Sequence, residues 1–397
     1  MSSNGWKKAS LESLCRTIYR YPTFYGFEAR SHGVPVLRGE HLQDYRLIEG
    51  SSGYSYVSEQ VSGQFPNTRV ELHDVVMAVR GTVGNFALVD EAHIGAQISP
   101  NLIRISADPQ KVDKKYFFYA LGPAVQRLIS SSVQSQALPS IAARDIKKLQ
   151  IFLPPSRSEQ ERIVEILEQR DLGIQRLQHL IGVMQQRKRG LMQVLLTGKK
   201  RFTEYANLAW RSAPLADYVA SARKGKPASL NDAGRGVPYI GSAAFDGDYT
   251  SHTDDPSAVR CSAKDVLLLW DGEYAGKSTT GHVGAVGSTV VAITLKPGLD
   301  PRYLHNLLLF HNQRIRSVRE GSGIPHMPSD FFTWFKPHLP PIEEQRTIAS
   351  VLSTADEEMR MLEAQLEAYE LQKRGLMQQL FTGEKRVNVD ISEAVPA

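Results

Sequence analysis

Two long stretches of the chain carry apolar side chains at alternating steps of four and three residues. A mostly apolar seam with a period of 3.5 residues, kept over several heptads, predicts helices that pair as a coiled coil. The seam positions are Ile163, Leu167, Ile174, Leu177, Ile181, Met184, Leu191 and Leu195 in the first stretch, and Ile348, Leu352, Met359, Leu362, Leu366, Tyr369, Leu376 and Leu380 in the second.

Signals for the ends of a helix flank these stretches. Pro154 and Pro155 precede the first, and Ser158 with Glu161 forms a predicted capping box. Gly198 and Gly383 stand where a glycine C-terminal cap is expected. We therefore expect each stretch to be one long helix.

The chain contains the same unit twice. KRGLMQ occurs at 188–193 and 373–378, and TGKKR at 197–201 matches TGEKR at 382–386, with a constant separation of 185 positions. LPPSRSEQERI and LPPIEEQRTI open the two stretches, and fainter matches upstream include Trp6 with Trp210. Such internal similarity predicts two copies of one architecture. The predicted boundaries are a globular segment at 1–152, a helix at 153–201, a linker and second globular segment at 202–338, a second helix at 339–386, and a tail at 387–397.

Charge and geometry favour pairing between the two helices within one chain. Residues 156–201 hold ten Lys/Arg and five Asp/Glu, whereas residues 342–386 hold six and nine, so the helices have opposite net charge. Each helix is about 60 Å long at about 1.5 Å per residue, whereas an eight-residue linker reaches at most about 28 Å. We expect an antiparallel pair with one globular segment at each end and a pseudo-two-fold arrangement. Two amphipathic helices packed on separate cores are the alternative.

The globular segments have the pattern of a mixed α/β fold. Short β-rich runs lie among glycine-rich turns, as in DVVMAV from Asp74, DVLLLW from Asp265 and VVAITL from Val290. A helix-like stretch follows in each segment, at 114–130 and 301–318. The fold class expected is therefore α/β, with two mixed α/β domains and two long helices.

Composition narrows the class of protein. The 397 residues include 42% hydrophobic and 22% charged residues, which suits a folded protein, and the net charge of +5 is a weak indication of a polyanionic partner. Only two cysteines are present, so a disulfide scaffold or a cysteine zinc site is excluded. With no apolar run of a signal peptide or of a membrane span, we expect a soluble, cytoplasmic protein without membrane association.

If the polyanionic partner is a nucleic acid, polar side chains near predicted turns are the candidates for contact with DNA. Arg and Lys suit guanine edges and phosphates, whereas Gln and Asn suit adenine. The candidates are Arg38, His41, Arg80, Asn85, Gln134 and Gln136 in the first segment, and Lys224, Lys226, Asp271, Lys277, Ser278, Arg319 and His326 in the second.

Motifs of ATP-dependent enzymes are incomplete in this chain. Asp90-Glu91-Ala92-His93 has the letters of a helicase motif, but the phosphate loop that a helicase needs upstream is missing, and GEYAGKS at 272–278 is one residue too short. The loop carboxylates form no recognisable nuclease cluster. We expect no catalytic site, no metal site and no cofactor bound to this chain.

The doubled helix openings, the doubled KRGLMQ and TGxKR closings and the order domain–helix–domain–helix resemble the specificity subunit of type I restriction–modification enzymes. The resemblance covers nearly the whole chain. It implies two target-recognition domains that read the two halves of a bipartite DNA sequence. It also implies partners: modification subunits, expected as two copies, that methylate adenine with S-adenosylmethionine, and restriction subunits that use ATP. The cofactors would belong to those partners.

Two other classes of function stay open at this point. One is a methyltransferase or nuclease with built-in recognition, which methylation by the isolated chain would favour. The other is a coiled-coil scaffold without a nucleic-acid role, which the absence of salt-sensitive DNA binding would favour.

Overall fold

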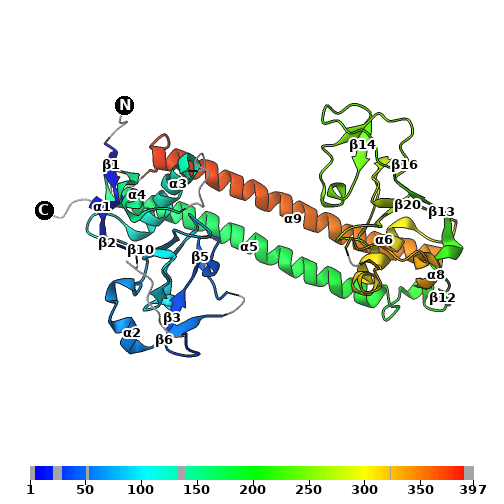
Figure 1. The fold of residues 1–397 in the computed structure, drawn as a ribbon, viewed down its shortest axis with the longest axis horizontal. Helices are drawn as coiled ribbons and strands as arrows, with labels where there is room; N and C mark the ends of the chain where they lie inside the picture. The colour runs from blue at the N-terminus through cyan, green and yellow to red at the C-terminus, as the bar shows by residue number, and fades with distance from the viewer. Residues whose placement is uncertain (1–4, 21–28, 51–52, 133–139, 322, 389–397) are drawn as a thin grey trace. The chain divides into compact units, whose positions relative to one another are not determined.

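The computed structural model describes residues 5–20, 29–50, 53–132, 140–321 and 323–388. The chain divides into two compact units, the first made of residues 1–176 and 366–397 and the second of residues 177–365. Each unit contains sheets, short helices and parts of the two long helices α5 (Arg157–Leu195) and α9 (Ile342–Thr382) (Figure 1). The mixed α/β class predicted from the sequence is therefore confirmed.

The first unit is built on a six-stranded sheet in the order β2-β10-β7-β8-β5-β4. Its central strands are the β-branched runs of the sequence, and all side chains of β7 and β10 are buried. A three-stranded sheet, β6-β3-β9, and the pair β1-β11 complete the unit's strands among the described residues. The strands are β1 (Lys7–Ser10), β2 (Cys15–Arg20), β3 (Val34–Leu37), β4 (Leu42–Gln43), β5 (Arg46–Leu47), β6 (Ser55–Val57), β7 (Val75–Ala78), β8 (Phe86–Leu88), β9 (Gln97–Ile98), β10 (Leu102–Ala107) and β11 (Gln150–Leu153).

The second unit repeats the central part of this sheet. Its order β13-β20-β17-β18 corresponds to β2-β10-β7-β8, without counterparts of β5 and β4 in that sheet. A second four-stranded sheet, β15-β14-β19-β16, and the pair β12-β21 complete it among the described residues. The strands are β12 (Arg211–Ser212), β13 (Val219–Lys224), β14 (Val237–Ile240), β15 (His252–Thr253), β16 (Arg260–Cys261), β17 (Val266–Leu269), β18 (Ser278–Thr280), β19 (Gly284–Val286), β20 (Val290–Leu295) and β21 (His338–Leu339).

Short helices connect the strands. The first unit has α1 (Leu11–Leu14), α2 (Glu59–Gly63), α3 (Lys114–Ser132) and α4 (Ala143–Lys148). The second has α6 (Pro301–Phe310), α7 (Asn312–Ser317) and α8 (Phe331–Trp334). The helix expected at 301–318 is therefore two helices, because the chain leaves helical geometry at His311, where φ is −91° and ψ is 9°.

In the first unit, the start of α5 lies antiparallel to the end of α9. Arg386 donates to both carboxylate oxygens of the buried Glu159, at 2.5 and 2.8 Å, and Lys373 is paired with Asp171. From Glu159 to Asp171 the residue number in α5 increases, whereas that of the partner decreases from Arg386 to Lys373. The two helices therefore run antiparallel here.

The second unit contains the same two ion pairs with the roles of the helices exchanged. Arg201 donates to both oxygens of the fully buried Glu344, at 2.9 and 2.6 Å, and Lys188 is paired with Asp356. The doubled motifs thus have a structural reason. The lysine of each KRGLMQ and the last arginine of each TGxKR meet a carboxylate from the opposite helix, which sets the register of the pair.

The glutamine of each Glu-Gln opening joins its long helix to the globular part of the same unit. Gln160 Oε1 accepts the backbone N–H of Asp113 at 2.8 Å, just before α3, and Gln345 Oε1 accepts that of Asp300 at 2.9 Å, just before α6. Both glutamines are buried. Each helix therefore starts as part of a domain core rather than as a free rod.

The two glycines expected as C-terminal caps have φ of +71°, and a tryptophan ring lies against each. A Cβ on Gly198 would lie 3.4 Å from the Trp210 ring, and one on Gly383 would lie 3.3 Å from the Trp6 ring. The left-handed backbone favours glycine at both positions. This packing explains why the faint Trp6–Trp210 match accompanies the TGxKR match.

The predicted seam agrees with the burial of the two long helices. All sixteen predicted seam side chains are buried or half-buried, and Ile163, Leu167, Ile348 and Leu352 are at most 1% exposed. The predicted capping box is wrong: α5 starts one residue before Ser158, and the side chain of Ser156 accepts the N–H of Glu159 at 3.2 Å.

No helix among the described residues is long and apolar enough to cross a membrane.

Candidate nucleic-acid interface

The same end of the central sheet presents a pair of polar side chains in each unit. In the first unit Arg20 is the last residue of β2. Strand β10 lies between β2 and β7, and Arg80 follows two residues after the end of β7, at the same end of the sheet as Arg20. In the second unit Lys224 ends β13, and Asp271 follows two residues after the end of β17. Arg20 with Arg80 and Lys224 with Asp271 therefore occupy equivalent positions.

The charge at this position differs between the units. Arg20 Nε donates to the Pro100 carbonyl at 3.4 Å, and within the described residues Arg80 has no hydrogen bond or ion pair from its guanidinium. Burial, and after it the nearby Arg80 cation, lowers the pKa of Arg20. In the second unit Lys224 Nζ lies 2.6 Å from Asp271 Oδ2, so the two charges cancel. The first unit thus presents two cations where the second presents a neutral pair.

Three of the predicted DNA-contact residues of the first unit lie exposed on neighbouring loops. Arg38, Arg80 and Asn85 are exposed, and a Cβ on Gly39 would lie 3.1 Å from Thr82 Oγ1, which places the loop after Arg38 against the loop after Arg80. Gln134 and Gln136 lie outside the described residues.

His41 does not fit the role predicted for it. Its side chain is fully buried, its Nδ1 accepts the N–H of Arg38 at 2.9 Å, and its ring lies 4.6 Å from that of Tyr54. Burial lowers the pKa of His41. A contact with a DNA base is therefore not supported, and His41 instead positions the loop that carries Arg38.

The predicted residues of the second unit are mostly engaged in pairs. Lys277 is paired with Asp246, and the Arg319 guanidinium donates to the carbonyls of Arg316 and Glu273, at 3.0 and 2.5 Å. Lys226 is exposed. Ser278 is buried and its hydroxyl lies 3.0 Å from His305 Nδ1, so a DNA contact is not supported for this serine either.

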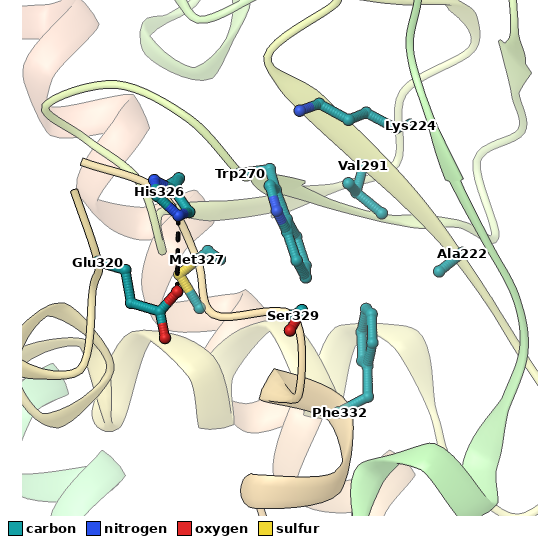
Figure 2. Close-up of a pocket in the computed structure, with 9 residues that line it drawn as sticks. All are labelled: Ala222, Lys224, Trp270, Val291, Glu320, His326, Met327, Ser329 and Phe332. Atoms are coloured by element: carbon teal, nitrogen blue, oxygen red, sulfur yellow. Dashed lines mark ion pairs between the residues drawn. The ribbon is translucent and has the colours of Figure 1, made fainter. Parts of the chain in front are cut away.

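Lys224 and His326 line a cavity of about 400 Å³ in the second unit (Figure 2). Trp270 lies in the middle of its wall, with the His326–Glu320 pair on one side and Ala222, Val291 and Lys224 on the other (Figure 2). The cavity is lined by Ala222, Lys224, Trp270, Val291, Glu320, His326, Met327, Ser329 and Phe332.

Sequence reasoning missed several residues at these sites. Arg20 was not a candidate, because its approach to Arg80 depends on the strand order β2-β10-β7. Trp270 was included in an apolar run, although a large aromatic residue between a buried strand and Asp271-Gly272 is a signal that could have singled it out. Among the described residues, no group of three or more His, Cys, Asp or Glu side chains could hold a metal ion.

Comparison with known proteins identifies the family. The family model described as the type I restriction modification DNA specificity domain matches the chain twice, over residues 4–181 and 208–369. The chain therefore belongs to this family. The resemblance inferred from the doubled motifs is confirmed, and the chain contains two such domains.

Individual relatives agree with this assignment. The chain is 39% identical over 119 residues to the type I restriction enzyme MjaVIII specificity subunit of Methanocaldococcus jannaschii, a match that spans 30% of this chain and only 28% of that protein. It is 24% identical over 377 residues to the putative MjaX specificity subunit of the same organism, which spans 89% and 88%. The crystal structure of a type I restriction–modification S subunit from M. genitalium has the same fold, with a TM-score of 0.59, 16% identity, and coverage of 96% and 97%.

Proposed function

We propose that this chain is the DNA-specificity subunit of a type I restriction–modification complex and that each unit reads one half of a bipartite DNA sequence. The observation that carries the proposal is that the same arrangement of central strands occurs in both units, with different side chains at the same end of the sheet. The Arg20–Arg80 pair of the first unit is replaced by Lys224–Asp271 in the second. Two units with the same order of central strands but different side chains at this end of the sheet suit two different half-sites.

Chemistry supports DNA as the ligand of the first unit. Two guanidinium groups without a carboxylate partner between them favour an anion, and arginine matches phosphate oxygens and guanine edges with paired donors. The exposed Arg38 and Asn85 on the adjoining loops add further donors to the same region.

The subunit itself is proposed to be non-catalytic and cytoplasmic. Methyl transfer from S-adenosylmethionine and ATP-dependent cleavage are assigned to separate modification and restriction subunits that assemble with it. The purified chain should therefore neither methylate nor cut DNA. Methyl transfer by the chain alone, in a preparation shown to lack modification subunit, would refute this part of the proposal and favour an enzyme with built-in recognition.

DNA binding by the complex with modification subunits tests the interface. Arg80→Ala and Arg20→Ala should each weaken binding, and each lost phosphate contact should reduce the slope of log affinity against log salt by about one. Arg16→Ala is the matched control, because Arg16 lies near the opposite end of the same strand and is 52% exposed. Equal losses for Arg16→Ala and Arg80→Ala would contradict an interface at this end of the sheet.

A further inference from the structure

The cavity of the second unit has the character of a binding site for a flat, uncharged molecule. The Trp270 and Phe332 rings lie 5.7 Å apart with an angle of 29° between their planes, and both are only partly buried. The buried side chains of Val291 and Met327 add apolar surface. Since Ala222 and other lining residues are exposed, the cavity opens to solvent.

The polar groups around the cavity lie in pairs of a donor-bearing and an acidic side chain. Lys224 Nζ lies 2.6 Å from Asp271 Oδ2. His326 Nε2 lies 3.6 Å from Glu320 Oε2 (Figure 2). A phosphate would therefore find no net positive charge, in contrast to the Arg20–Arg80 position of the first unit. The same groups offer both hydrogen-bond donors and acceptors, which is what the edge of a heteroaromatic ring requires.

Size agrees with this chemistry. A volume of about 400 Å³ falls within the range of small-molecule sites, which are about 300–1,000 Å³. A single methyl group, such as that of thymine in the major groove, would leave most of it empty. Aromatic side chains beside a cavity of this kind hold nucleobases by stacking in proteins that bind unpaired nucleotides.

We propose that this cavity takes one nucleobase of the second half-site, turned out of the DNA stack and held against Trp270. The proposal rests on the proposed function, which places DNA at this end of the sheet. The ion pair between Lys224 and Asp271 then holds the Lys224 side chain at the edge of the cavity. His326 or Glu320 offers a hydrogen bond to the base. The two units accordingly recognise DNA by different means, the first by paired cations and the second by an aromatic cavity.

The test uses the chain assembled with its modification subunits on DNA that carries its mapped site. A mismatch is introduced at each position of each half-site in turn, and affinity is measured. Turning out a base costs least when the base is already unpaired. Apart from the adenines that the modification subunits turn out for methylation, one mismatch in the second half-site should therefore tighten binding by about tenfold or more, while no mismatch in the first half-site should do so.

Two variants connect the effect to the cavity. Trp270→Ala should weaken binding to the matched site by about 5- to 100-fold, as expected for loss of one stacked base, and Trp270→Phe should restore most of it. Ala222→Trp fills the cavity from an exposed position without removing a packing contact, so it should weaken binding similarly even if Trp270→Ala fails to fold. Tyr274→Ala is the control, because this exposed aromatic residue lies on the neighbouring loop outside the cavity.

Two outcomes would overturn the inference. If Ala222→Trp binds like the wild type and no mismatch in the second half-site tightens binding, while the complex still recognises a bipartite sequence, the cavity does not hold a base. If the wild-type complex prefers no DNA sequence, the proposed function fails together with the inference.

Discussion

Leu167→Ala and Leu371→Ala make the same change at two sites of the paired helices in the first unit. Leu167 is 0% exposed and belongs to the core that also contains Ile163 and Leu380, whereas Leu371 is 63% exposed on the other helix. A leucine truncated in a closed core loses about 3 to 5 kcal/mol, since the transfer free energy of the removed atoms is lost and a cavity is left behind. An exposed leucine changes stability by about 0.5 kcal/mol or less.

Thermal and urea unfolding of the isolated chain measure both variants. With a shift of about 2 to 4 °C per kcal/mol for a unit of this size, Leu167→Ala should lower the melting temperature by about 6 to 20 °C, and Leu371→Ala by about 2 °C or less. Equal losses at the two sites would refute the account in which the predicted seam, and not the outer face, holds the helices in the core.

Two further predictions concern buried polarity in the second unit. Leu177→Asp places a carboxylate in the half-buried seam and should lower the free energy of unfolding by several kcal/mol, measured by chemical unfolding. Gln178→Asp, at the exposed neighbouring position, should be nearly neutral. Equal tolerance of the two substitutions would contradict the predicted seam. Burial first, and then the nearby Lys188 cation, lowers the pKa of His305 to about 4, so the neutral ring is the form that fits the fold. Stability contributed by this histidine is therefore complete above its unfolded pKa of about 6.5 and is lost as pH falls toward 4, by about 3 kcal/mol. His305→Gln should flatten that part of the stability–pH curve, and an unchanged curve would count against the buried neutral ring.

The sequence predicted the elements whose signals are local. The apolar runs at 75–78, 266–269 and 290–295 are strands, and the stripe of apolar positions fixed the buried faces of α5 and α9 because helical periodicity acts over neighbouring turns. The doubled motifs predicted the repeat, although not their role. That Glu159 and Glu344 receive the arginines of the opposite copies follows only from the antiparallel register.

The proposed interface was less accessible to sequence reasoning, since its residues meet through strand order. Arg20 approaches Arg80 only because β10 lies between β2 and β7, and Lys224 loses its free charge to Asp271 for the equivalent reason. His41 and Ser278 have polar side chains near loops, as the candidates were expected to have, yet each is turned inward to a hydrogen bond that holds the local structure. Polarity near a loop is therefore not enough to predict that a side chain is exposed.

Mapping the methylated adenines made by the chain with its modification subunits tests the central claim most directly. The comparison is between the wild-type chain and a chain whose residues 1–150 are replaced by the corresponding segment of another member of the family. Because each unit has its own sheet and its own reading end, the exchange should change one half of the recognised sequence and leave the other half as it was. A change of both halves, or of neither, would contradict the claim that the two units read DNA independently.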